Sequence, residues 1–76
     1  MIIKILGSGC PKCKQLEENT RKALALSGVN ATVEKVTEMN KIMEFGVMAT
    51  PALVVDGVVK SMGKLLSPED IKKLIL

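Results

Sequence analysis

The chain has 76 residues, enough for one small domain (residues 1–76) that buries about 60% of the surface exposed by its unfolded form. Its 47% apolar and 25% charged residues exclude an intrinsically disordered chain. The formal net charge is +3, and the eleven basic residues alternate with eight acidic ones instead of forming a basic stripe with stacking aromatic residues. We therefore expect a solvated surface of mixed charge and no nucleic-acid partner.

The first apolar run, residues 1–6, is interrupted by Lys4 and is too short for a signal peptide or a membrane span. We therefore expect a cytoplasmic protein without membrane association. In that compartment a cysteine pair stays reduced unless it is catalytic, redox-sensing or metal-bound. A disulfide across two residues closes too small a loop to stabilise the fold appreciably, so a structural role for the pair is the weakest explanation.

The only two cysteines, Cys10 and Cys13, stand where an apolar run is followed by a helical pattern. Residues 2–6 favour a strand in a partly parallel sheet, and the glycines of residues 7–9 end it because they relax the backbone constraint. Cys10 occupies the predicted N-cap of the next helix, with Pro11 at its first position, where a missing N–H costs nothing. A C-x-x-C at such a place is typical of a thiol–disulfide exchange site.

Residues 11–27 have the spacing of an amphipathic helix. Its predicted inner face consists of Cys13, Leu16, Thr20, Ala23, Leu24 and Ser27. Gly28 suits the left-handed residue that follows a helix. Residues 31–36 are rich in β-branched side chains and predict a second strand, parallel to the first across a right-handed connection.

A short helix is predicted over residues 38–45, with Thr37 as its N-cap and Gly46 at its end. Its expected buried positions are Met39, Ile42 and Met43. We expect the five methionines of the chain to fill irregular gaps in the core, because the thioether side chain is flexible.

Residues 50–55 predict a third strand, and Asp56-Gly57 predicts a two-residue hairpin turn into residues 58–61. The last helix should have Ser67 as N-cap and Pro68 at its first position. It is expected to pack through Leu66, Ile71, Leu74 and Ile75. The order β-α-β-α-β-β-α indicates an α/β fold with a four-stranded mixed sheet flanked by helices.

In this order of elements the chain resembles the thioredoxin fold in its minimal form, over nearly its whole length. The resemblance rests on Cys10-Pro11-Lys12-Cys13 after the first strand, Ala49-Thr50-Pro51 at the third, and Met62-Gly63-Lys64 before the last helix. The Gly-x-Gly-Cys-x-x-Cys start and the short length resemble the small thioredoxin- or glutaredoxin-like redox proteins of archaea and some bacteria. Gly9 stands where many thioredoxins have tryptophan, and Lys12 where glutaredoxins have tyrosine.

The resemblance implies a protein dithiol–disulfide oxidoreductase, expected to be a monomer without a cofactor, with disulfide-containing proteins and an unidentified reductase as partners. Cys10 is the expected attacking thiol, because a thiolate at a helix start meets unpaired N–H groups and the positive end of the helix dipole. Lys12 is expected to tune this thiolate further. Cys13, on the inner face of the helix, is the expected resolving thiol.

The resemblance also implies a cis peptide bond before Pro51, which would place Thr50 beside the Cys10 sulfur. There Thr50 could pair with an extended substrate segment in the manner of a strand, and Gly63 could line the same groove. Alternatively, Pro51 merely opens a strand and Gly63 merely ends the hairpin.

Two other functions are compatible with the cysteine pair. Soft-metal carriers also place C-x-x-C after a first strand, and thiolates bind Cu(I) and Zn(II). Those domains usually have the order β-α-β-β-α-β, and a four-ligand zinc site would need a second chain because this one has no histidine. A non-catalytic adaptor with the same fold would not require an intact cysteine pair.

Overall fold

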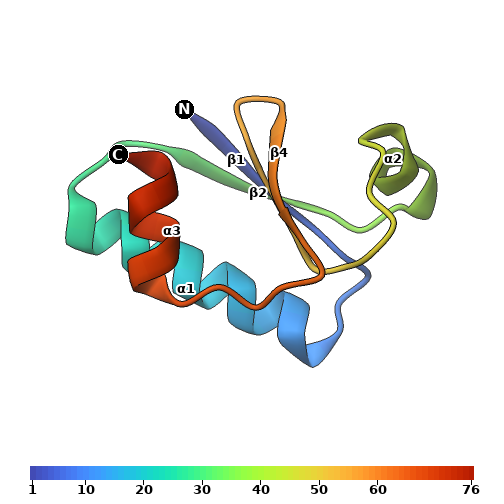
Figure 1. The fold of residues 1–76 in the computed structure, drawn as a ribbon, viewed down its shortest axis with the longest axis horizontal. Helices are drawn as coiled ribbons and strands as arrows, with labels where there is room; N and C mark the ends of the chain where they lie inside the picture. Colours follow the sequence, from blue (N-terminus) through green and yellow to red (C-terminus); the bar gives the residue numbers. More distant parts are fainter.

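The structure is a computed structural model that describes residues 1–76. Its elements are β1 (Ile2–Leu6), α1 (Pro11–Ser27), β2 (Thr32–Val36), α2 (Met39–Glu44), β3 (Ala52–Val55), β4 (Val58–Met62) and α3 (Pro68–Ile75). The four strands form one sheet in the order β2-β1-β3-β4 (Figure 1). Strand β1 runs parallel to β2 and antiparallel to β3, which pairs antiparallel with β4. The predicted α/β order and mixed sheet are confirmed.

The sheet separates two groups of buried apolar residues, because successive side chains of a strand point to opposite faces. Helices α1 and α3 lie together on one face (Figure 1). The core on that face consists of Ile3, Ile5, Leu16, Ala23, Leu53, Val55, Ile71 and Ile75. The smaller core on the face of α2 consists of Leu6, Ile42, Val47, Ala52 and Val54.

Helix α1 has the bounds and caps that the sequence predicts. It follows Cys10, which has an extended backbone, and precedes Gly28, whose φ of 70° is left-handed. Its buried face contains one residue that the periodicity did not include, Asn19, which is 8% exposed. The Asn19 side-chain amide donates a 2.9 Å hydrogen bond to the carbonyl oxygen of Leu66, so this polar residue connects α1 to the segment before α3.

Helix α2 differs from its prediction. Its N-cap is Glu38 instead of Thr37, and no side chain caps it. Only Ile42 of its three expected core residues is buried; Met39 is 59% and Met43 is 65% exposed. Six residues make fewer than two turns, so this helix presents only the side of Ile42 to the sheet.

All five methionines of the chain lie on the surface, each at least 43% exposed. The expectation that they fill gaps in the core is therefore wrong. Isoleucine, leucine, valine and alanine supply nearly all of both cores, and these branched or small side chains leave no gap that needs a flexible thioether.

The hairpin between β3 and β4 confirms its prediction, although β3 begins at Ala52, later than expected. Asp56 and Gly57 have φ angles of 49° and 83°, the signs of a type I′ turn. The Asp56 carboxylate accepts a 2.8 Å hydrogen bond from the N–H of Ile2, and the Asp56 N–H donates a 2.8 Å bond to the carbonyl oxygen of Ile2. The turn is thereby fastened to the first residue of β1.

Helix α3 begins as predicted, because the Ser67 hydroxyl accepts a 3.2 Å hydrogen bond from the N–H of Asp70. Ile71 and Ile75 are buried, whereas Leu74 is 37% exposed and does not belong to the core as expected.

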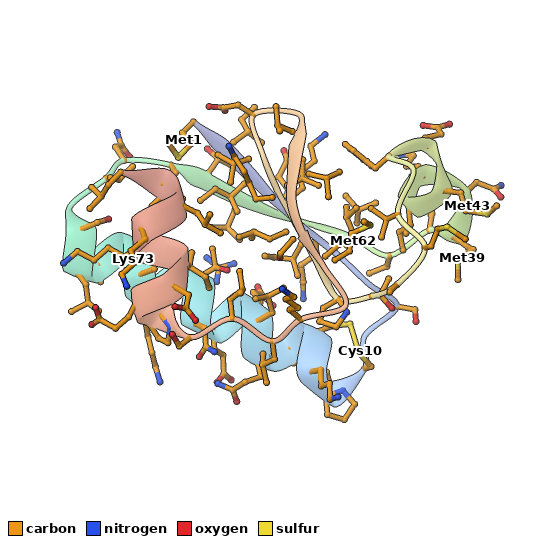
Figure 2. The ribbon with its side chains drawn as sticks, viewed as in Figure 1. Met1, Cys10, Met39, Met43, Met62 and Lys73 are labelled. Carbon is orange, nitrogen blue, oxygen red and sulfur yellow. A yellow bond between two sulfur atoms is a disulfide. The ribbon has the colours of Figure 1, made fainter.

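The two termini lie at the same end of the molecule (Figure 1). The turn from β1 into α1, which carries the cysteines, lies at the opposite end of the sheet (Figure 2). None of the helices has the length and apolar character that crossing a membrane requires.

Candidate active site

The sulfur atoms of Cys10 and Cys13 are joined as a disulfide at the turn from β1 into α1 (Figure 2). Their Cα atoms are 5.1 Å apart, inside the range of about 4.4–6.8 Å that bridged cysteines adopt. Cys10 is the N-cap of α1, and its sulfur accepts a 3.2 Å hydrogen bond from the N–H of Cys13. Pro11 follows at the first helical position.

The two sulfur-bearing residues differ in exposure. Cys13 lies on the inner face of α1 and is only 6% exposed, whereas Cys10 is partly exposed. This asymmetry arises because Cys10 precedes the helix at its solvent-facing end, and Cys13 lies almost one turn into it. A second molecule can therefore approach Cys10 more directly than Cys13.

Gly7, the residue that follows β1, lies directly against Cys13. A Cβ atom on Gly7 would overlap the Cys13 sulfur and would lie 3.1 Å from the Cys13 Cβ. Gly7 is therefore required for space, while Gly9, with a φ of 88° and open surroundings, is required for conformation.

The segment before β3 closes another side of the site. A Cβ atom on Gly7 would lie 3.9 Å from the Cβ of Thr50, so Thr50 lies beside the disulfide. The Thr50–Pro51 peptide bond is cis, with Pro51 buried and Thr50 exposed. Gly63 lies next to them, because its N–H donates a 2.8 Å hydrogen bond to the carbonyl oxygen of Pro51. The structure thus brings together all three residues that the sequence suggested for substrate contact.

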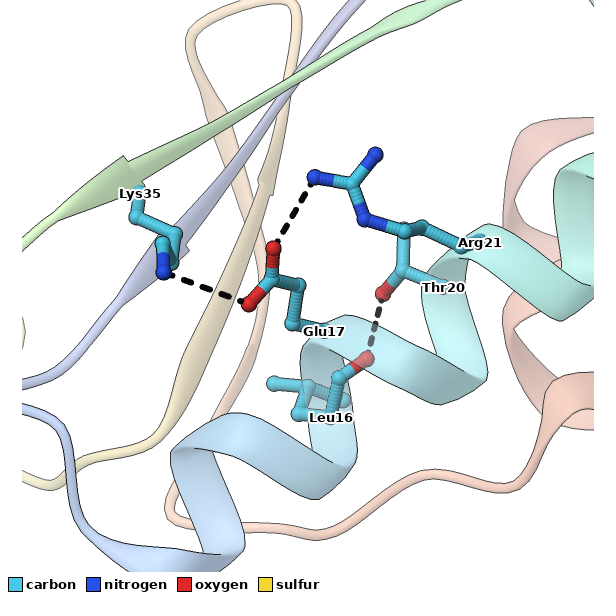
Figure 3. Close-up of polar contacts among 5 residues, drawn as sticks. All are labelled: Leu16, Glu17, Thr20, Arg21 and Lys35. Carbon is cyan, nitrogen blue, oxygen red and sulfur yellow. Dashed lines mark hydrogen bonds and ion pairs between the residues drawn. The ribbon is translucent and has the colours of Figure 1, made fainter.

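The charged residues near the disulfide are of two kinds. Lys12 and Lys14 are exposed on the first turn of α1, which contains no acidic residue. Glu17, one turn beyond Cys13, forms ion pairs with Arg21 at 2.9 Å and with Lys35 of β2 at 3.6 Å (Figure 3). The hydrogen bond from Arg21, helped by the charge of Lys35, lowers the pKa of Glu17 against the opposing effect of burial.

A cavity of about 70 Å³ lies between the first turns of α1 and the ends of β1 and β2. Its lining consists of Ile5, Gly7, Gly9, Cys13, Lys14, Glu17, Lys35 and Thr37. It is large enough for water and too small for a peptide. Sequence reasoning missed Glu17 and Lys35 as neighbours of Cys13, although Glu17 stands four residues after Cys13, the spacing that places two side chains on one face of a helix.

A larger depression of about 640 Å³ lies between β2 and α2 and includes neither cysteine. Charged and polar side chains, including Lys4, Glu34 and Lys41, form most of its lining. The structure gathers no group of three or more histidine, cysteine, aspartate or glutamate side chains able to hold a metal ion.

Comparison with known proteins supports the chemistry of the cysteine pair. A family model described as a thioredoxin domain matches residues 1–76. A protein named thioredoxin from Methanothermobacter thermautotrophicus is 47% identical over 75 residues, which cover 99% of this chain and 97% of that protein. Another protein named thioredoxin, from Methanocaldococcus jannaschii, is 44% identical over 73 residues, covering 96% of this chain and 84% of that protein.

A cysteine pair that forms a disulfide within one helical turn can pass between the dithiol and disulfide states by exchange with another disulfide. Its position after the first strand of this fold agrees with the family match over the whole chain. The chain therefore belongs to the thioredoxin-domain family, as a thiol–disulfide oxidoreductase whose redox pair is Cys10 and Cys13.

Proposed function

We propose that this oxidoreductase reduces disulfides in other proteins, with Cys10 as the attacking thiol and Cys13 as the resolving thiol. The observation that supports these roles is the difference in exposure: Cys10 is open to an approaching disulfide, and Cys13 is 6% exposed within α1. An attacking thiolate must be accessible, whereas a resolving thiol has only to reach the neighbouring sulfur.

The reaction begins with the dithiol form of the protein. The Cys10 thiolate attacks one sulfur of the substrate disulfide, so a mixed disulfide forms and the other substrate sulfur leaves as a thiolate. Cys13 then loses its proton and attacks the Cys10 sulfur, which forms the Cys10–Cys13 disulfide and releases the remaining substrate sulfur. Two electrons pass to the substrate, and its two sulfurs end as thiols after protonation.

The start of α1 stabilises the thiolate of Cys10. The Cys13 N–H, 3.2 Å from the Cys10 sulfur, is positioned to donate to the anion, and the 17 residues of the helix direct the positive end of their dipole toward it. Lys12 and Lys14 add a smaller contribution, because exposed flexible ammonium groups are screened by solvent.

The substrate chain lies along Thr50 and Gly63. Thr50 is exposed beside the disulfide and can present its backbone to an extended segment in the manner of an added strand. Gly63 has no side chain, so a second backbone can approach it closely. Pro51 is buried and positions Thr50.

A reductase must return two electrons to the Cys10–Cys13 disulfide after each cycle. We place the protein in the cytoplasm, where reducing conditions keep such a pair available as a dithiol. It acts as a single domain and as a monomer, since both edge strands carry charged side chains that disfavour pairing with another sheet, among them Lys35 on β2 and Lys60 on β4.

A redox titration of the metal-free protein against dithiothreitol, with alkylation and intact mass as the readout, tests the exchange chemistry. We expect a reversible two-electron transition between about −180 and −300 mV. Absence of the disulfide at every potential, together with stoichiometric Cu(I) binding, would instead indicate a metal carrier. A Cys10→Ser, Cys13→Ser double variant that kept the cellular function would indicate an adaptor.

Single variants separate the roles of the two cysteines. Cys13→Ser should accumulate a mixed disulfide with a protein substrate through Cys10, because no resolving thiol is present. Cys10→Ser should form far less of this adduct. The reverse pattern would exchange the two roles.

A further inference from the structure

Four exposed methionines lie at the end of the molecule that carries the redox site. Met39 and Met43 extend from α2 on the same side of the molecule as Cys10, and Met62 lies between them and the sheet (Figure 2). The fourth, Met48, is 95% exposed and stands two residues before Thr50. Methionine is normally among the residues found inside proteins, so four such side chains in solvent at one end require an explanation.

We propose that Met39, Met43, Met48 and Met62 form a methionine surface that binds the apolar polypeptide segment flanking the disulfide of a protein substrate. The inference rests on the proposed function and adds to it a class of substrate: disulfides whose neighbouring residues are apolar and can extend over this surface.

The chain connects the methionine surface to the redox site without a break. The N–H of Gly46 donates a 2.9 Å hydrogen bond to the carbonyl oxygen of Met43 and begins the loop that leads to Thr50. Met48 lies on that loop, and two residues span at most about 7 Å, so its backbone stays within that distance of Thr50.

Met62 closes the other side of this path. It stands opposite Ala52 in the pairing of β3 with β4, directly before Gly63. Side chains opposite each other in a sheet point to the same face, so Met62 lies on the face that α2 partly covers. The surface therefore extends from both sides of the Thr50–Pro51 segment toward α2.

The chemistry of the reaction identifies the occupant. A disulfide of another protein must reach the Cys10 sulfur, so the chain on either side of that disulfide must lie over the neighbouring surface during exchange. That surface has no aromatic side chain beside the cysteines, since Phe45 is the only aromatic residue and is partly buried against the smaller core. Apolar contact with the substrate therefore falls to the methionines.

Methionine suits a surface that must accept many sequences. Its unbranched, polarizable side chain adapts to different partners without a fixed pocket, which allows binding of related segments with different residues. Met39 and Met43 stand four residues apart on α2 and therefore lie on the same helical face, which forms the outer part of the surface.

The test uses the pre-reduced protein and two oxidants in excess: insulin, whose disulfides lie in a polypeptide, and bis(2-hydroxyethyl) disulfide, which carries no polypeptide. The rate of Cys10–Cys13 disulfide formation is followed by alkylation and intact mass for the wild type, Met48→Gln and Met43→Gln. The matched control is Leu26→Gln, since Leu26 is 59% exposed near the other end of α1.

We expect Met48→Gln to lower the rate constant with insulin by about tenfold, which corresponds to about 1.4 kcal/mol, and Met43→Gln to lower it by a smaller factor. Both variants should react with the small disulfide within about twofold of wild type, a difference below about 0.5 kcal/mol. Leu26→Gln should match the wild type with both oxidants.

Three results would overturn the inference: unchanged rates with insulin, equally slowed rates with both oxidants, or a wild-type dimer that Met48→Gln dissociates without any change of rate. The last would assign the surface to a second copy of this chain. A wild type that oxidises with the small disulfide but never with insulin would overturn the proposed function itself, and this inference with it.

Discussion

Gly7 and Cys13 are in such close contact that no side chain fits between the end of β1 and the inner face of α1. The position of the buried sulfur thus depends on the absence of a side chain six residues earlier in the chain. The partly exposed sulfur of Cys10 has no comparable restriction, since Gly9, the residue before it, faces open space. The strand end holds one cysteine in place and leaves the other accessible.

Replacing Gly7 by alanine should therefore disturb the redox pair from behind. We expect Gly7→Ala to destabilise the protein by about 1–3 kcal/mol, the usual cost of an extra methyl group in a packed region. Displacement of Cys13 should also slow resolution, so that mixed disulfides accumulate. Urea unfolding and trapping by alkylation measure the two effects. Ser8→Ala, at the exposed neighbouring position, is the control, and equal stability of the two variants would contradict the prediction.

Asn19 should be required for the attachment of α3 to α1. In Asn19→Ala the carbonyl oxygen of Leu66 loses its 2.9 Å hydrogen bond in a partly buried place, and an orphaned acceptor of this kind costs about 1–3 kcal/mol. Denaturant unfolding measures the loss. Glu18→Ala, exposed on the same helix, should change stability far less, and similar losses for the two variants would show that the hydrogen bond contributes nothing.

Asp56 combines two functions in the hairpin, a left-handed backbone and an acceptor for the N–H of Ile2. Asparagine keeps both, so Asp56→Asn should change the free energy of unfolding by less than about 0.5 kcal/mol. Alanine keeps neither and should cost about 1–2 kcal/mol, because a left-handed backbone is unfavourable for it. Thermal and urea unfolding compare the two variants. If alanine were tolerated as well as asparagine, the turn would not depend on this side chain.

Glu17 should make the stability of the protein sensitive to acid. Its pKa in the folded state lies below its usual value of 4.5, so the ionised side chain stabilises the fold above that value. The stabilisation is lost as the pH falls through the folded pKa. Glu17→Gln should lower the Tm at pH 7 by a few degrees at most, since such ion pairs contribute about 0–1 kcal/mol and each 1 kcal/mol shifts the Tm by about 4–8 °C.

The difference in Tm between wild type and Glu17→Gln should disappear when both are melted at a pH well below 4.5. Calorimetry across this range provides the measurement, with Glu18→Gln as the control on the exposed face of the helix. A difference that persisted unchanged in acid would assign the effect of Glu17 to packing instead of charge.

Features encoded by neighbouring residues could be predicted from the sequence. The caps at Ser67 and Gly28 and the Asp56-Gly57 turn depend on the conformational preferences of one or two residues, and all are present as predicted. The position of Cys10 at the start of α1 follows in the same way from the glycines and the proline around it.

Features that depend on the meeting of distant segments could not be predicted. Periodicity places Met39 and Met43 near Ile42 on a helix, but it does not say how little of a short helix meets the sheet. The ion pair of Glu17 with Lys35 and the contact of Gly7 with Cys13 require the positions of β2 and α1 relative to β1. A polar residue such as Asn19 enters a buried face only because a carbonyl group of another segment is there to receive it.

The placement of both termini at the end of the molecule away from the cysteines has a practical consequence (Figure 1). A linker attached to either terminus would leave from the side opposite Cys10 and would not obstruct an approaching disulfide. The chain could therefore be immobilised on a resin, or joined in tandem to another protein, through its first or last residue while its cysteines remained accessible. Fusion would raise the local concentration of a chosen substrate, and exchange with that substrate would then depend on linker length more than on intrinsic affinity.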